Sequence, residues 1–183
     1  MKKIRFATIW VAGCAGCHMS FLDTDEWLFD LAQYVDVVYS PALVDRKEYP
    51  ENVDVCVVEG AIGNEEHLEF IHQVRKNTKL LISLGDCAVT SNVSGLRNKY
   101  GSAEPVLKRT YWELADLNPQ SPYDDEGILP KLLDRVMPVH EVVPVDLFIP
   151  GCPPEAERIK AAIEPLLNNK LPVMEGREMI KFG

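Results

Sequence analysis

The stretch IRFATIWVAGCAGC (residues 4–17) joins an apolar run to two closely spaced cysteines. Residues 4–11 are short and almost continuously apolar, which predicts a buried first strand. The pair Cys14 and Cys17 follows just beyond Gly13, where the strand is expected to have ended. The stretch therefore predicts a strand inside a sheet and, at its carboxyl end, a loop that carries two thiols.

Outward from this stretch, short apolar runs alternate with segments of helical period. Further strands are expected at Val35–Tyr39, Val53–Val58, Lys79–Leu84 and Val145–Ile149. Helices are expected at Ser20–Tyr34 (with a capping box of Ser20 and Asp23), after a cap at Asn64, from about Ser91 to Tyr100, at Ile128–Met137 and from Pro154 onward. This alternation predicts an α/β fold, with a mainly parallel sheet that helices cover on both faces.

The size and composition fit a single domain over residues 1–183. With 183 residues, 46% of them hydrophobic, the chain can bury a core without disulfides or metal. Residues 101–126 contain three prolines and show no clean period, so we expect an irregular loop or docking segment there. Residues 170–183 follow the last expected helix as a C-terminal tail.

Charge and hydropathy exclude several classes of protein. The formal net charge of −9 argues against binding to nucleic acid, and no apolar run approaches the ~20 residues needed to cross a bilayer. Phe6–Ala12 followed by Gly13 and Cys14 imitates a short lipoprotein signal, but no polar tether follows it. We therefore expect a cytoplasmic protein without membrane insertion, in which thiols stay reduced.

Four of the five cysteines follow the ends of expected strands. The first strand precedes Cys14 and Cys17, the fourth precedes Cys87 and the fifth precedes Cys152. The carboxyl ends of parallel strands share one edge of a sheet, so these four thiols are expected to converge. Cys56 lies inside the third strand instead and is expected to be a core residue.

Four thiolates, two from one Cys-x-x-Cys turn and one from each of two other loops, suit a [4Fe–4S] cluster, in which each iron takes one soft, deprotonated ligand. Glycines beside the cysteines let backbone approach such a cluster closely; they are Gly13, Gly16, Gly85 and Gly151. Backbone N–H groups there stabilise the negative charge added on reduction and help to set the reduction potential. The cofactor that the residues predict is therefore one [4Fe–4S] cluster.

Two other chemistries remain open from the residues alone. Four thiolates can hold a tetrahedral zinc ion, which would make the chain a binding module stabilised by metal. The pair Cys14 and Cys17 can also form a redox-active dithiol, although that leaves Cys87 and Cys152 without a role.

Four segments resemble the small subunits of nickel–iron hydrogenases, in particular those of the cytoplasmic, NAD-coupled, bidirectional type. They are WVAGCAGCHMSFLD (residues 10–23), VEGAI (58–62), SLGDCA (83–88) and IPGCPP (149–154), within a resemblance that spans roughly residues 4–165. The resemblance implies a flavodoxin-like, doubly wound fold. It also implies that the cluster proximal to the nickel–iron site is bound by Cys14, Cys17, Cys87 and Cys152.

The same resemblance implies partners and a role. The partners would be the nickel–iron large subunit and diaphorase subunits that carry flavin and further iron–sulfur clusters. The chain would relay electrons between them within an NAD-reducing oxidoreductase complex, with no bond-making chemistry of its own. Bound FMN is possible in this resemblance, but no motif in the sequence supports it.

Two departures narrow the resemblance. Membrane-bound and periplasmic relatives carry a twin-arginine leader and a second cluster-binding domain, and this sequence shows neither, which favours the short cytoplasmic type. The alternative assignment is the corresponding subunit of NADH:quinone oxidoreductase, which typically has two adjacent cysteines at its first ligand position. Ala15 and Gly16 separate the cysteines here, which favours a hydrogenase.

Several other residues are candidates for a role near the cluster. Glu59 ends the third strand and could orient a loop or move protons, while His18 could hydrogen-bond a cluster sulfur or a carbonyl of the partner. Asp86 is expected to bond backbone within its turn. An apolar contact with the large subunit could use Met19, Phe21, Trp27, Tyr111 and Trp112, of which Phe21 and Trp27 could equally be core.

Overall fold

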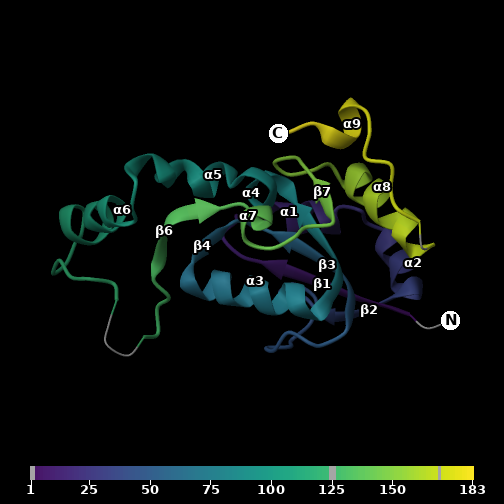
Figure 1. Cartoon of the computed structure of the whole chain (residues 1–183), viewed down its shortest axis with the longest axis horizontal. Helices are drawn as coiled ribbons and strands as arrows, with labels where there is room; N and C mark the ends of the chain where they lie inside the picture. Colours follow the sequence, from purple (N-terminus) through teal and green to yellow (C-terminus); the bar gives the residue numbers. More distant parts are fainter. Residues whose placement is uncertain (1–2, 124–126, 169) are drawn as a thin grey trace.

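A parallel sheet forms the centre of the protein in the computed structural model, which describes residues 3–123, 127–168 and 170–183 (Figure 1). In the described part of the chain this sheet has five strands in the order β2-β1-β3-β5-β7. Their bounds are Val35–Tyr39 (β2), Ile4–Trp10 (β1), Val53–Glu59 (β3), Thr78–Leu84 (β5) and Leu147–Ile149 (β7). All five predicted strands are confirmed, and their order is that of the flavodoxin-like fold.

The strands end level with one another at their carboxyl ends. In the register of the sheet, Trp10 pairs with Glu59, Glu59 with Leu84, and Leu84 with Ile149. The loops that follow β1, β3, β5 and β7 therefore leave the same edge of the sheet.

Helices lie on both faces of this sheet (Figure 1). The longer ones are α2 (Trp27–Tyr34), α3 (Glu65–Asn77) and α8 (Ala156–Leu167). The shorter ones are α1 (Gly16–Leu22), α4 (Gly85–Thr90), α5 (Asn92–Gly95), the 3₁₀ turn η1 (Leu96–Tyr100), α6 (Glu104–Lys108), the π-helical turn η2 (Arg109–Glu113), α7 (Val139–Val142) and α9 (Arg177–Ile180). Asn64 caps α3 as predicted, since its Oδ1 accepts the N–H of His67 at 2.7 Å.

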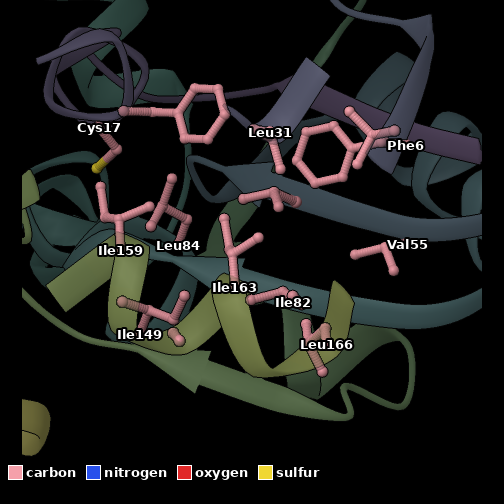
Figure 2. Close-up of a cluster of buried hydrophobic side chains, with 14 of the residues drawn as sticks. Phe6, Cys17, Leu31, Val55, Ile82, Leu84, Ile149, Ile159, Ile163 and Leu166 are labelled. Carbon is pink, nitrogen blue, oxygen red and sulfur yellow. The ribbon is translucent and has the colours of Figure 1, made fainter. Parts of the chain in front are cut away.

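Two apolar clusters form the core, one on each face of the sheet. Figure 2 shows the first, in which Phe6, Leu31, Ile82 and Ile163 point toward one another and Cys17 lies at the margin. The second cluster lies between the opposite face and α3, and it contains Cys56, which is 0% exposed. The prediction that Cys56 is a core residue is therefore confirmed.

The predicted helix at Ile128–Met137 is wrong. Leu132–Met137 forms strand β6, which pairs antiparallel with β4 (Ile62–Asn64) in a separate two-stranded sheet. The apolar spacing over this segment suited either structure. Pro130 disfavours a helix interior because it lacks an N–H and clashes with the preceding turn.

The predicted helix at Ser20–Tyr34 is broken into α1 and α2. Asp25 lies between them at φ +49°, which no helix accommodates. The predicted capping box is also wrong, because Ser20 lies inside α1 and its hydroxyl donates to the carbonyl of Pro154. The last long helix begins at Ala156 rather than Pro154.

Two further segments depart in part from prediction. The predicted helix from about Ser91 is α5 followed by η1, with Ser91 itself at φ +67°. The segment predicted as irregular contains α6 and η2, which lie away from the main sheet, while residues 114–123 form no helix or strand (Figure 1). Residues 124–126 of that prediction lie outside the described residues.

The position of β1 inside the sheet argues against the interpretation of residues 6–14 as a lipoprotein signal. β1 pairs with β2 on one side and β3 on the other, and Phe6, Ala7 and Ile9 are at most 1% exposed. These residues are therefore structural parts of the core. Among the described residues, no helix has the length and apolar character needed to cross a membrane.

Candidate metal centre

The start of α4, which carries Cys87, is bonded directly to the loop that carries Cys152. The N–H of Asp86 donates to the carbonyl of Gly151 at 2.8 Å, and the N–H of Gly151 donates to Asp86 Oδ1 at 2.6 Å. Asp86 therefore joins α4 to the Cys152 loop with its side chain, in place of the bond predicted within its own turn.

The loop of Cys14 and Cys17 lies against the loop of Cys87. A Cβ atom added to Gly85 would lie 2.2 Å from Cys17 Sγ, and one added to Gly16 would lie 3.2 Å from Cys14 Sγ. Gly85 also has φ +81°, which other residues rarely adopt. Glycine at position 85 thus leaves room for a sulfur from another loop.

The other two predicted glycines have a different role. A Cβ atom at Gly13 would lie 3.1 Å from Gly60 Cα, and one at Gly151 would lie 2.5 Å from Pro154 Cα. Their contacts are therefore with backbone that follows β3 and with backbone of the Cys152 loop, and both allow close packing of the loops around the thiols.

Burial and neighbouring charges act on the Cys17 and Cys87 thiols. The pKa of Cys17 is raised mainly by burial, then by the charge of Glu59, and then by the other three cysteines: Cys14, Cys87 and Cys152. Burial also raises the pKa of Cys87, and Cys152 and Cys14 raise it further. Burial and negative charge favour the neutral form of these two thiols, so a metal centre that binds them as thiolates must offset both effects.

Hydrogen-bond donors face two of the sulfurs. Backbone N–H groups of Ser94 and Val93 bond Cys87 and oppose the rise in its pKa. The side-chain amide of Asn92 donates to Cys152 Sγ at 3.3 Å. Asn92 was not predicted as a residue of this site, because the only indication in the sequence was its position in the segment after Cys87.

The chemistry of these donors fits an iron–sulfur cluster. The site offers four soft thiols, a glycine that admits a sulfur, and N–H groups directed at thiolate. Cys17 is buried, Cys87 is half-buried, and Cys14 and Cys152 are exposed, so the site opens to the surface. A cluster of this kind takes one thiolate per iron; within the described ranges, no three His, Cys, Asp or Glu side chains lie together as ligands of one and the same metal ion.

Glu59 and His18 are both buried beside the Cys17 loop. Glu59 is 1% exposed, and its carboxylate accepts the N–H groups of Cys17 at 3.3 Å and His18 at 2.8 Å. It also bonds His18 Nδ1 at 2.5 Å, and His18 Nε2 bonds Thr8 Oγ1 at 3.0 Å. His18 is therefore directed into the protein. Glu59 orients the segment that carries Cys17, which is one of the two roles predicted for it.

The predicted C-terminal tail lies against the Cys152 loop, a contact that no pattern in the sequence indicated. Gly183 N–H donates to Asp86 Oδ2 at 2.9 Å. Arg158 Nη1 donates to the carbonyls of Pro150 at 2.6 Å and Lys181 at 2.8 Å. Asp86 and Arg158 thus hold residues 181–183 beside the fourth cysteine.

The aromatic and apolar candidates for a subunit contact separate into two groups. Phe21 is 3% exposed and Trp27 is 7% exposed, so both are core residues. Met19, Tyr111 and Trp112 are 41–58% exposed and remain available to a partner.

Fold and site together define a class: a flavodoxin-like α/β protein with four cysteines just beyond the carboxyl ends of strands at one edge of its sheet. Residues 14–166 match the family model of the NADH ubiquinone oxidoreductase 20 Kd subunit, and the chain belongs to that family.

Similar curated proteins are hydrogenase subunits. The NAD-reducing hydrogenase HoxS subunit delta of Cupriavidus necator is 38% identical over 172 residues, which cover 92% of this chain and 80% of the relative. One subunit of the F420-non-reducing hydrogenase of Methanothermobacter thermautotrophicus is 38% identical over 176 residues, which cover 92% of this chain and 55% of the relative. The chain thus spans little more than half the length of that relative.

Solved structures agree with this assignment. A structure of an NAD+-reducing [NiFe]-hydrogenase in the H2-reduced state matches with a TM-score of 0.90 and 36% identity, and covers 100% of both chains. The Ni-Fe-Se hydrogenase of Desulfomicrobium baculatum matches with a TM-score of 0.59 and 16% identity over 95% of this chain and 68% of that one, which shows the fold alone. The predicted resemblance to small subunits of nickel–iron hydrogenases and the flavodoxin-like fold are confirmed.

Proposed function

We propose that this chain relays electrons through one [4Fe–4S] cluster bound by Cys14, Cys17, Cys87 and Cys152. The observation that carries the proposal is the meeting of the cysteine-bearing segments at the sheet edge, where a Cβ atom on Gly85 would lie 2.2 Å from Cys17 Sγ and Asp86 bonds Gly151 beside Cys152. Thiolates on converging segments repel one another without a cationic centre, and an iron–sulfur core is such a centre.

Each part of the site has a task in this relay. The cluster supplies one-electron chemistry when it is bound. The cysteines hold it, burial of Cys17 limits water at one corner, and the N–H groups of Ser94, Val93 and Asn92 stabilise negative charge on two of the sulfurs. No side chain here is proposed to make or break a bond of the substrate.

The proposed partners are the nickel–iron large subunit, which would exchange electrons at the exposed side of the cysteines, and a diaphorase module that reduces NAD. The name of the Cupriavidus relative, an NAD-reducing hydrogenase subunit, supports this proposal. We propose that the complex works in the cytoplasm, where thiols stay reduced. An assignment to quinone-reductase-type subunits remains the second candidate, because the matching family model is named for them.

Metal analysis of the anaerobically purified protein tests the proposal. We expect close to four irons and four acid-labile sulfides per chain, in a brown protein with broad visible absorbance. A colourless protein with one zinc ion would favour the zinc-binding module, and a metal-free protein with a reducible Cys14–Cys17 disulfide would favour the dithiol.

Substitution of single cysteines tests the ligand set. Cys87→Ala should destroy or convert the cluster, because it removes one of four ligands. Cys56→Ala is the matched control and should leave the spectrum intact, since Cys56 is fully buried in the second core cluster. Bleaching by Cys56→Ala but not by Cys87→Ala would show that the ligand set is wrong.

A further inference from the structure

A buried polar chain runs from the cysteine edge into the sheet. Glu59 at the end of β3 bonds His18 in α1, His18 bonds Thr8 in β1, and the Thr8 hydroxyl donates to Ser40 Oγ at 2.9 Å. All four side chains belong to residues that are at most 7% exposed. Burying a carboxylate is unfavourable unless hydrogen bonds compensate, so this arrangement requires all of the partners that Glu59 has.

Two of those partners are N–H groups at the start of α1. The first N–H groups of a helix have no acceptor within the helix, so they are free to bond a nearby anion. Here the N–H groups of Cys17 and His18 donate to Glu59. The carboxylate thus takes two donors that would otherwise be available to a cluster at Cys17.

The charge of Glu59 also reaches the Cys17 sulfur. Oε1 of Glu59 lies 3.3 Å from the backbone nitrogen of Cys17, so the carboxylate is close to the residue that would bind the cluster. A negative charge beside a ligand disfavours the extra electron on a reduced cluster. Both effects of Glu59, its charge and its use of N–H donors, act in the same direction.

We propose that Glu59, fixed by His18 and Thr8, is a positioning residue that lowers the reduction potential of the cluster bound at Cys17. The inference rests on the proposed function, since it presupposes that cluster. In this role Glu59 neither ligates iron nor takes part in a chemical step. It makes the reduced cluster a stronger electron donor by keeping a carboxylate beside one ligand.

Glu59→Gln tests the proposal, because glutamine keeps the shape of the side chain and removes its charge. The readout is the midpoint potential of the cluster, from a redox titration followed by EPR on the protein in the complex in which it is purified. We expect a more positive potential, by on the order of tenfold in the ratio of reduced to oxidised cluster at a fixed ambient potential, or about 59 mV. Iron and sulfide content should stay unchanged.

Glu51→Gln is the matched control. Glu51 is exposed and lies two residues before β3, near the opposite end of the strand from Glu59. The substitution changes the net charge by the same amount beyond the far end of β3, which spans about 20 Å at 3.3 Å per residue. Its cluster should keep the wild-type potential. An equal shift in both variants, or an unchanged potential in Glu59→Gln with its cluster intact, overturns the proposal.

Glu59→Asp gives a second, independent check. It retains the charge but withdraws the carboxylate by one methylene group, so the potential should shift in the positive direction by clearly less than in Glu59→Gln. If Glu59→Gln fails to take up a cluster, this variant decides: a cluster whose potential stays close to the wild-type value supports the proposal, and a cluster whose reduced-to-oxidised ratio rises by about tenfold overturns it. Loss of the cluster in both variants also overturns it, because it would show a structural role alone.

The outcome for the wild-type protein separates the two proposals. If the wild-type protein contains no iron and sulfide, both the proposed function and this inference are refuted. If the wild-type protein has a normal cluster and Glu59→Gln does not change its midpoint potential, the proposed electron relay stands and only this inference is refuted.

Discussion

Gly85→Ala places a methyl group where the structure holds the sulfur of Cys17. Gly85 has φ +81°, so alanine costs about 1–2 kcal/mol in backbone strain alone. The new Cβ would lie 2.2 Å from Cys17 Sγ, and relief of such overpacking costs about 1–3 kcal/mol more. The sum, roughly 2–5 kcal/mol, is a large part of the stability of a domain of this size.

A matched variant separates the two costs. Gly101 has φ +78°, and a Cβ atom there would meet nothing within 4 Å, so Gly101→Ala carries the backbone strain without the clash. At about 2–4 °C per kcal/mol for a chain of this length, Gly101→Ala should lower the melting temperature by about 2–8 °C. Gly85→Ala should lower it by clearly more.

Differential scanning fluorimetry at one fixed scan rate measures both variants, with iron content determined on the same samples. We expect Gly85→Ala to lose iron as well as stability, because Cys17 must move to admit the methyl group. If Gly85→Ala melts no lower than Gly101→Ala and keeps its iron, Cys17 does not pack against position 85 and the described convergence of the loops is refuted.

Three further outcomes are expected. Ile82→Ala, at a residue that is 0% exposed in the central sheet, should cost about 2–5 kcal/mol in urea unfolding, whereas Leu117→Ala at an 86% exposed residue should stay within about 0.5 kcal/mol. Burial raises the pKa of Cys56 from 9.0 to about 12, so the contribution of its neutral thiol to stability is full below pH 9 and is lost as the pH rises toward 12. The urea midpoint of the cluster-free chain should therefore fall above pH 9. Cys56→Ala should make that fall smaller. A midpoint that rises with pH would contradict this sign. Deletion of residues 176–183 should leave the circular dichroism spectrum nearly intact but speed the loss of iron to a chelator, because the bonds from Asp86 and Arg158 hold that segment beside Cys152.

The main sheet could be predicted because its strands are buried on both faces. Val53–Glu59 and Thr78–Leu84 carry nearly unbroken apolar runs, which need no knowledge of their neighbours to be identified. The cap at Asn64 was equally local, since it depends on a side chain and an N–H three residues apart. The same topology placed the four cysteines at one edge.

The wrong predictions concern segments whose structure depends on contacts with residues far away in the sequence. Strand β6 is a strand because β4 supplies a partner for Leu132–Met137, a pairing that lies outside any local window. The hydroxyl of Ser20 bonds a carbonyl 134 residues away instead of capping a helix. The bonds of Asn92 to Cys152 and of Gly183 to Asp86 likewise depend on the finished fold.

The separation of the cysteines along the chain has a consequence for biosynthesis. Cys17 and Cys152 are 152 − 17 = 135 residues apart, and Cys152 follows the edge strand β7. At ribosomal rates of about 5–20 residues per second, roughly 7–27 s pass between the synthesis of the second thiol and the fourth. A nascent chain therefore presents a partial set of thiols for many seconds, which short contiguous ferredoxin motifs avoid. Assembly of the proposed cluster on all four cysteines would have to wait until translation has passed β7.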